Sequence, residues 1–322
     1  MDDDLRDLLR LMVVARRLDE ECVALQRQGV LPAYAPALGQ EAAQVGSAAA
    51  LDLERDFAFP TYRELGAAVA MGVDPVAYLA THLNIWHGGL YDPSATHLAP
   101  FNAVVGGPVT HAVGWAMGAQ LDGTGGAAIT YFGDGASSQG DVHEAMNFAG
   151  VYRLPVVFFC QSNGWAISVP TDQQVAGGSV AARAAGYGIE GQQVDGNDVT
   201  AVREATRDAL QRARAGGGPT VIEAITYRMG PHSTSDDPRR YRSTEDERAW
   251  AERDPIARTA SSLPAEALSS AEEHAEAVVR ETGERLRALP PPPGDELFSF
   301  VYREPTAPLL DQQRAWKESQ HA

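Results

Sequence analysis

The chain has 322 residues, of which 44% are hydrophobic, and a formal net charge of −17 at pH 7. This length allows one large α/β domain or two smaller ones, and it is sufficient to bury a substantial core. The negative charge argues against a nucleic-acid partner and against an anionic membrane surface, because both require a basic face. With only two cysteines, Cys22 and Cys160, neither a disulfide framework nor a thiolate metal site is expected.

The N-terminal residues 1–6 are acidic and lack the basic and then apolar order of a secretory signal. No apolar run reaches the length of a membrane-spanning helix. Because the few cysteines favour a reducing compartment, we expect a cytoplasmic protein, from a bacterium.

Hydrophobic spacing and turn residues predict the elements in chain order. Helices are expected first, over 5–28, 41–51, 64–71 and 75–86 and, after an irregular stretch at 88–108, over 110–121. A strand at 127–132, a helix at 139–152 and a strand at 156–160 follow. The last elements are a strand at 192–194, a helix capped by Asn197 and Asp198 that runs to 215, a strand at 220–227 and a helix at 264–289 that ends before a proline break at 290–293. This alternation predicts an α/β fold with a doubly wound, largely parallel sheet.

Polar residues follow two of the predicted strands. Asp134 lies between Gly133 and Gly135 after the first strand, and Asn163 follows the second strand, 29 residues after the aspartate. Open parallel sheets bind ligands at the carboxyl ends of such strands. A carboxylate, an amide oxygen and a nearby backbone carbonyl suit Mg²⁺, while the glycines allow the backbone to approach phosphate groups. The pattern therefore predicts a site for a diphosphate and a metal ion.

Two other interpretations fit parts of this pattern. A Gly-Asp-Gly triplet alone is also typical of a tight turn after a strand. A dinucleotide-binding fold would also place Gly133, Gly135 and Gly140 between a strand and a helix. However, the fingerprint spacing is absent, and the second strand ends near Asn163, where an acidic ribose ligand would be expected.

Three longer segments, 131–141, 158–168 and 227–237, resemble the α subunit of the thiamine-diphosphate-dependent E1 component of 2-oxo acid dehydrogenase complexes. The run His-Ser-Thr-Ser-Asp-Asp that begins at His232 is most similar to the branched-chain enzymes. The similarity extends from about Tyr62 to the segment 298–302. It implies the thiamine-diphosphate-binding fold, with thiamine diphosphate and Mg²⁺ as cofactors. It also implies decarboxylation of a 2-oxo acid and transfer of the acyl group to the lipoyl group of an E2 acyltransferase.

The resemblance also implies roles for single residues. The metal ligands are expected to be Asp134, Asn163 and the backbone carbonyl of Trp165. The catalytic residue is expected to be His232, which would position or protonate substrate and intermediates. The residues expected to contact the cofactor are Tyr62, Arg63, Val105, Gly133, Asp134, Gly135, Ala136, Gln161, Asn163, Arg228 and His232.

In the family, the glutamate that activates the cofactor belongs to a β subunit, so the resemblance implies an α2β2 heterotetramer. We expect residues 1–262 to form the cofactor-binding α/β domain with an N-terminal docking helix, and residues 263–322 to form a C-terminal helix and an extended arm that contacts the β subunit. Some positions depart from the family pattern: Gln161 replaces an arginine that contacts phosphate, Thr61 a glutamine and Ala103 a serine. The shortened stretch 97–105 leaves open whether His97 acts as an active-site histidine.

Two alternatives to a branched-chain enzyme remain open. One is a pyruvate- or acetoin-type E1 α subunit. The other is a non-catalytic paralogue that keeps the fold as an assembly module. The presence of Asp134, Asn163 and His232 argues against the second, whereas Gln161 and the short loop favour it.

Overall fold

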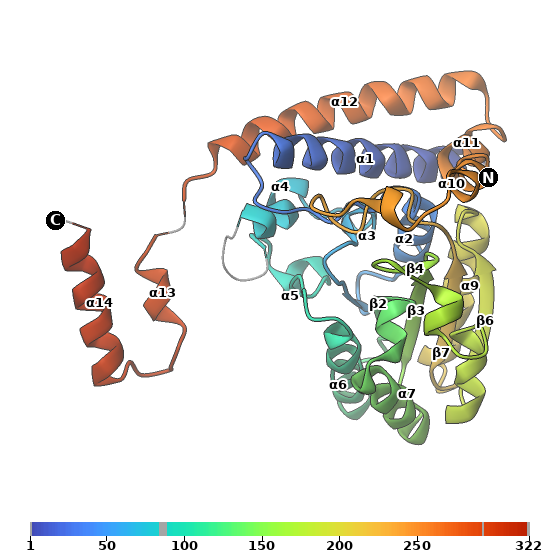
Figure 1. Ribbon diagram of the computed structural model, residues 1–322. Helices are drawn as coiled ribbons and strands as arrows, with labels where there is room; N and C mark the ends of the chain where they lie inside the picture. Colours follow the sequence, from blue (N-terminus) through green and yellow to red (C-terminus); the bar gives the residue numbers. More distant parts are fainter. Residues whose placement is uncertain (1, 84–88, 292, 321–322) are drawn as a thin grey trace. The chain divides into compact units, whose positions relative to one another are not determined.

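The computed structural model describes residues 2–83, 89–291 and 293–320, and the chain divides into two compact units, Met1–Arg287 and Ala288–Ala322. The first unit is built on a five-stranded sheet in which every neighbouring pair is parallel (Figure 1). The strand order is β1 (Phe57–Phe59), β2 (Ala128–Gly133), β3 (Val156–Ser162), β7 (Thr220–Ile225) and β6 (Glu190–Asp195). The predicted parallel α/β sheet is thus confirmed.

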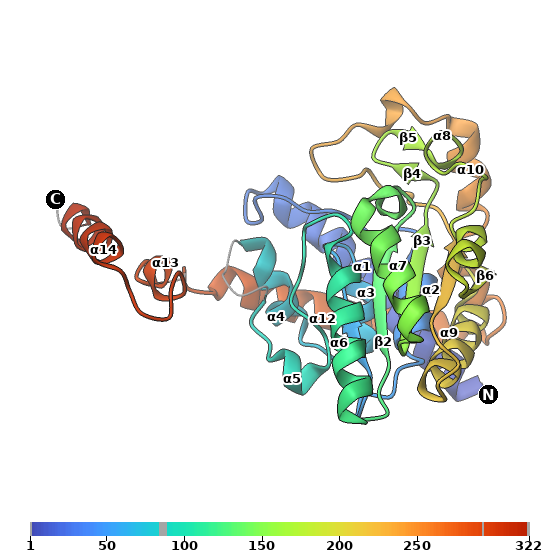
Figure 2. The same cartoon turned by 90° about the horizontal axis from the view of Figure 1, so that it is seen from below.

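Helices cover both faces of this sheet, as expected for a doubly wound fold (Figures 1 and 2). On one face, α6 (Gly107–Asp122) and α7 (Gly140–Tyr152) form a core with the β3 residues Val156, Phe158 and Cys160. Successive strand residues point to opposite faces, so Tyr131 of β2 points the other way and its hydroxyl lies 3.1 Å from the hydroxyl of Ser47. Ser47 belongs to α2 (Glu41–Ala48), which packs beside α9 (Val199–Arg214).

The long N-terminal helix α1 (Asp2–Arg27) packs on α2 and on α3 (Leu65–Ala70), and α12 (Ala265–Ala288) runs alongside α1 (Figure 1). The apolar positions of α1 recur at helical spacing and are buried. The remaining short elements of this unit are α4 (Pro75–Leu79), η1 (Ala80–Leu83), α5 (Pro93–Thr96), η2 (Gly135–Ser138), β4 (Trp165–Ala166), β5 (Val169–Pro170), α8 (Thr171–Gln174), η3 (Ala181–Tyr187), η4 (Pro238–Arg240), α10 (Thr244–Ala251) and α11 (Pro255–Ala260).

Some boundaries differ from the predicted ones. The helix predicted at 75–86 is α4 followed by the 3₁₀ turn η1, and the end of the predicted range lies outside the described residues. The helix predicted from residue 110 begins at Gly107, because the left-handed Gly106 precedes it (φ 84°). The three-residue strand β1 and the small β4–β5 hairpin were not predicted, since neither is long enough to show a period.

The described residues of the second unit include the helices α13 (Glu296–Ser299) and α14 (Ala307–Ser319). The rings of Phe298 and Trp316 lie 6.0 Å apart, and Lys317 Nζ lies 3.1 Å from a carboxylate oxygen of Asp295. An extended arm was expected here, whereas these contacts fold the described residues into a helix pair. The boundary between the units also lies later than residue 262, and α12 falls almost entirely within the first unit.

Across the described ranges of the chain, none of the helices combines the length and the apolar character needed to cross a membrane. Both cysteines, Cys22 and Cys160, are buried and unpaired.

A buried ion pair joins the amino ends of β1 and β2 to α9. The carboxylate of Asp56, which directly precedes β1, accepts hydrogen bonds from both ends of the Arg214 guanidinium. It also accepts from the amides of Ala127 and Asp52, at 3.0 and 2.9 Å. Because Asp56 has no exposed surface, loss of the guanidinium would leave a buried charge without its counter-ion.

We therefore expect Arg214→Met to lower the free energy of unfolding by about 3 kcal/mol. The matched control is Arg285→Met, which breaks an exposed pair with Asp74 (2.5 Å) and is expected to cost less than about 1 kcal/mol. Urea unfolding followed by circular dichroism measures both changes. Equal losses in the two variants would contradict a special role for the buried pair.

Candidate active site

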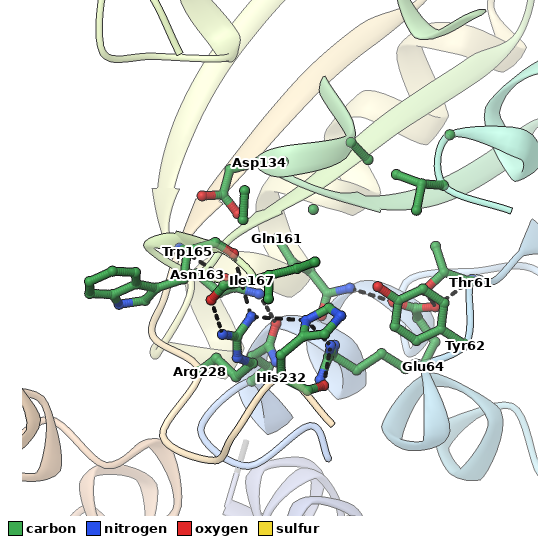
Figure 3. A pocket seen from close by; sticks show the side chains of 18 of the residues that line it. Thr61, Tyr62, Glu64, Asp134, Gln161, Asn163, Trp165, Ile167, Arg228 and His232 are labelled. Atoms are coloured by element: carbon green, nitrogen blue, oxygen red, sulfur yellow. Dashed lines mark hydrogen bonds between the residues drawn. The ribbon is translucent and has the colours of Figure 1, made fainter. Parts of the chain in front are cut away.

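A cavity of about 290 Å³ opens at the carboxyl ends of β2 and β3 (Figure 3). Its walls come from segments that are far apart in the sequence, between residues 40 and 232. Every residue that the sequence predicted to hold cofactor or metal lines this cavity: Tyr62, Arg63, Val105, Gly133, Asp134, Gly135, Ala136, Gln161, Asn163, Trp165, Arg228 and His232. The structure therefore brings all the predicted site residues together.

Asp134 lies in the cavity wall and is only 1% exposed. Its Oδ2 accepts a hydrogen bond from the Thr171 hydroxyl, while its Oδ1 is buried without a partner in the described part of the chain. Burial raises the pKa of this carboxyl above its usual value. A bound cation would supply the missing partner and favour the charged form. Asp134 thus fits a metal ligand.

Asn163 is buried and directly follows β3. The register pairs Gly133 of β2 with Gln161 of β3, so Asp134 and Asn163 both come just after the ends of these neighbouring strands. Its Oδ1 accepts from the backbone amide of Trp165 at 3.3 Å, and its Nδ2 donates to Gln40 Oε1 at 3.2 Å. Among the described residues, no group of three or more His, Cys, Asp or Glu side chains is arranged to hold a metal ion. The expected ligand set, with one carboxylate, one amide oxygen and one backbone carbonyl, is of a different kind.

The backbone comes close to the cavity at Gly135. A Cβ atom at this position would lie 2.7 Å from the side chain of Ala166 in the β4–β5 hairpin, so only glycine fits. The hairpin also contains Ile167, a β-branched residue with φ of 57°, which is an unfavourable conformation for this residue type. The Ile167 carbonyl accepts a hydrogen bond from Arg228 Nη2 at 2.9 Å, and this contact helps to hold the hairpin against the cavity.

Two arginines and a histidine meet on one side of the cavity, and Figure 3 labels two of the three, Arg228 and His232. Arg63 Nη2 lies 3.3 Å from His232 Nδ1 and donates to the His232 carbonyl at 3.0 Å. Arg228 Nη1 lies 3.5 Å from the same ring nitrogen. Burial, followed by the charges of Arg63 and Arg242, lowers the pKa of Arg228 to about 10, so the group remains charged at neutral pH. Such a pair of guanidinium groups suits phosphate oxygens.

The same neighbours keep His232 neutral. Burial, together with the charges of Arg63 and Arg228, lowers the pKa of His232 from 6.5 to about 4. Because guanidinium groups can only donate, His232 Nδ1 is an acceptor, and the ring proton therefore resides on Nε2. The backbone of His232 is fixed as well, since its amide donates to Asp236 at 2.8 Å.

Gln161 lines the cavity, but its amide is already engaged in a buried network. Its Nε2 donates to Glu64 at 2.7 Å, and its Oε1 accepts from Gln44 at 3.0 Å. Glu64 also accepts from the amide and hydroxyl of Thr61, and Gln44 donates to the Arg63 carbonyl at 3.0 Å. The network holds the loop that carries Arg63, and burial raises the pKa of Glu64.

The segment 34–40 is anchored to α1. Asp19 of α1 is 3% exposed, and one of its carboxylate oxygens accepts from the Tyr34 hydroxyl at 2.8 Å and from the Ala37 amide at 2.7 Å. Burial raises the pKa of Asp19 to about 7. Carbonyl groups of this segment in turn accept hydrogen bonds from the cavity walls: Pro36 from the Arg63 guanidinium, Leu38 from the Met229 amide and Gly39 from the Thr226 hydroxyl.

His97 lies away from the cavity. It ends α5 in a left-handed conformation, and its Nδ1 lies 2.8 Å from the carbonyl oxygen of Asp56, before β1. This position is at the amino end of the sheet, whereas the cavity is at the carboxyl end. A role for His97 as an active-site histidine is therefore not supported.

Several lining residues were not predicted. Gln40, Glu64, Gly106, Gln139, Ala166 and Ile167 also face the cavity. Glu64 directly follows the predicted Tyr62 and Arg63, and this adjacency was the one feature of the sequence that indicated its place in the cavity wall. Gln40 belongs to no motif that the sequence analysis recognised.

Comparison with known proteins agrees with this geometry. The family model described as dehydrogenase E1 component matches residues 9–285. The chain belongs to the dehydrogenase E1 component family. It is 47% identical over 319 residues to the 3-methyl-2-oxobutanoate dehydrogenase subunit alpha of Mycobacterium tuberculosis. The matched region covers 97% of this chain and 86% of that relative.

Two further relatives are less similar to this chain. The 2-oxoisovalerate dehydrogenase subunit alpha of Bacillus subtilis is 42% identical, with 79% of this chain and 80% of the relative covered. The pyruvate dehydrogenase E1 component subunit alpha of Staphylococcus epidermidis is 38% identical, with coverages of 99% and 88%. Membership of the E1 family implies an oxidoreductase that depends on thiamine diphosphate. The family resemblance inferred from the sequence is thus confirmed.

The low pKa of His232 predicts a pH effect on stability. Above pH 6.5 the residue is neutral in both states, but between pH 6.5 and about 4 the unfolded chain takes up a proton that the folded chain does not. The folded state therefore loses stability as the pH falls through this range. We expect His232→Gln to lose less stability than the wild type between pH 7 and 5, measured by urea unfolding. His97→Gln, which removes a histidine outside the cavity, is the control; an identical pH dependence of His232→Gln and wild type would contradict the prediction.

Proposed function

We propose that the chain is the α subunit of an E1 component that decarboxylates a branched-chain 2-oxo acid with thiamine diphosphate and Mg²⁺. The buried Oδ1 of Asp134, which has no partner among the residues that the structure describes, carries the proposal for the metal site. The 47% identity to a 3-methyl-2-oxobutanoate dehydrogenase subunit alpha supports the branched-chain substrate. Thiamine diphosphate, when bound, supplies the electron sink for decarboxylation.

Asp134, Asn163 and the carbonyl of Trp165 are the proposed metal ligands. They lie in adjoining parts of one wall, after β2 and β3. The diphosphate is assigned to the side where Arg63 and Arg228 converge. Charge supports these assignments, because the Asp134 carboxylate suits a cation and the two guanidinium groups suit an anion. The two parts of the site adjoin, since Arg228 Nη1 lies 3.4 Å from the Trp165 carbonyl oxygen.

His232 is the proposed catalytic residue. Its ring is held by the two arginines with the proton on Nε2, so it can donate a hydrogen bond to a substrate oxygen that gains negative charge. An anion bound between the arginines would offset their charges and raise the pKa of His232 toward the range useful for proton transfer. Tyr62, whose ring lies 6.2 Å from the His232 ring, bounds the same space.

The proposed partners are a β subunit, in an α2β2 heterotetramer, and a lipoyl-bearing E2 acyltransferase that receives the acyl group. The relatives are named as alpha subunits, which implies a second kind of subunit. A cytoplasmic location stays a prediction.

A pyruvate-type substrate is the second candidate, because the pyruvate dehydrogenase α subunit of Staphylococcus epidermidis is 38% identical over 99% of this chain. An acetoin-type enzyme and a non-catalytic assembly module are less well supported. The buried Asp134 oxygen, the paired arginines and the neutral His232 support a ligand-binding site, which an assembly module does not need.

The co-expressed α and β chains should turn over 3-methyl-2-oxobutanoate with a higher kcat/KM than pyruvate, measured with an artificial electron acceptor. A separate variant, Asp134→Asn, tests the metal site. It keeps the side-chain volume but removes the charge, and it should weaken Mg²⁺-dependent cofactor binding by about tenfold or more. A preference for pyruvate would replace the substrate assignment. Unchanged cofactor affinity in Asp134→Asn would remove Asp134 from the metal site.

The second unit carries exposed apolar side chains at Leu297, Val301 and Tyr302, which are 45–56% exposed. Exposed groups of this kind often mark a partner surface. Truncation after Pro293 should therefore leave an α chain that assembles poorly with β. A full-length variant with serine at these three positions keeps the helix pair and should show the same loss. Elution of both variants as heterotetramers at low micromolar concentration would exclude an assembly role.

A further inference from the structure

The orientation of two neighbouring amides in the cavity is fixed by a single backbone group. The Trp165 amide can only donate, so the Asn163 atom that lies 3.3 Å from it is the oxygen. The Asn163 nitrogen therefore faces the other way and donates to Gln40 at 3.2 Å. The acceptor on Gln40 must be its oxygen, and the Gln40 Nε2 group is left over as a donor.

This donor has no partner among the described residues. Gln40 is fully buried and lines the cavity, yet its Nε2 makes no hydrogen bond. The residue occupies the N-cap position of α2 but does not use its side chain as a cap. A buried donor without an acceptor is unfavourable, so its presence in a cavity wall points to an acceptor on a ligand.

We propose that Gln40 couples the metal ligand to the diphosphate. Its oxygen holds the Asn163 amide so that the oxygen of that amide remains available to Mg²⁺. Its Nε2–H donates to an oxygen of the cofactor diphosphate. The inference rests on the proposed function and extends it by a positioning residue that also contacts the cofactor.

The other unpartnered polar atoms of the cavity fit this assignment. Within the described residues, Asp134 Oδ1 is a buried acceptor without a donor, and Arg228 Nε is a buried donor without an acceptor. A ligand that satisfies all three atoms presents a cation to Asp134 and an anion to Gln40 and Arg228. A metal–diphosphate group has this combination of charges.

The first test compares Gln40→Met with wild type in the co-expressed αβ complex. Methionine has a similar size but lacks both the acceptor for Asn163 and the free N–H. We expect the affinity for thiamine diphosphate to fall about tenfold to hundredfold in calorimetry, and the Mg²⁺ concentration needed for half-maximal binding to rise. The variant removes the unpaired Gln40 donor but takes the acceptor from the Asn163 N–H, so the thermal midpoint of the cofactor-free complex should change little.

The second variant, Gln40→Glu, separates the two roles. A carboxylate still accepts from Asn163, so the Mg²⁺ requirement should stay near that of wild type, while the repelled diphosphate binds at least as weakly as in Gln40→Met. Affinity for thiamine, which has no phosphate, should not differ between wild type and either variant. If both variants bind thiamine diphosphate with the wild-type affinity, the inference about Gln40 is overturned, while the proposed function stands. If the wild-type complex binds no thiamine diphosphate, the proposed function fails and the inference fails with it.

Discussion

Two hydrogen bonds to a carboxylate in α1 hold the segment that joins both sides of the cavity. Asp19 accepts from the Tyr34 hydroxyl and the Ala37 amide, and the segment 34–40 that they fix has no regular secondary structure. Such a segment must satisfy its backbone groups through contacts with its surroundings. Its carbonyls do so by accepting from Arg63 on one side and from the chain after β7 on the other. Although no cavity-lining residue comes from α1, this helix therefore fixes the distance between the walls.

The parts of the fold that could be predicted are those with a strong local pattern. Strands β2 and β3 are continuous apolar runs, and α1 and α9 have clear helical periodicity, so their positions followed from the sequence to within a few residues. Strand β1 has three residues and is defined by its neighbours, because β2 pairs with it and Leu98 forms a further bridge to Ala58. The segment that forms the helix pair of the second unit was expected to be extended. The contact of Phe298 with Trp316 joins residues that are far apart in the sequence, and a local hydrophobic pattern does not reveal it.

The candidate site divides in the same way. Asp134 and Asn163 were identifiable because each follows a strand and their spacing spans one βαβ unit. Gln40 meets Asn163 across 123 positions of sequence, and nothing in its own neighbourhood indicates this contact. The sequence also identified Gln161 as a departure from the family pattern. It could not indicate that the amide of Gln161 is occupied by Glu64 and Gln44, since this network exists only in the folded chain.

The residues of the cavity wall come from segments between residues 40 and 232, so the cavity forms only when the chain is folded. A nascent or partly unfolded chain contains the separate pieces but no site, so a ligand of this cavity binds the native state alone. Mass action then adds about 2.7 kcal/mol to the stability of the native state when the free ligand is present at a hundred times its Kd. Protein that is made when the ligand is scarce lacks this added stability and is unfolded for a larger fraction of the time. A stability change of this size is enough to alter the steady-state amount of a protein in a cell.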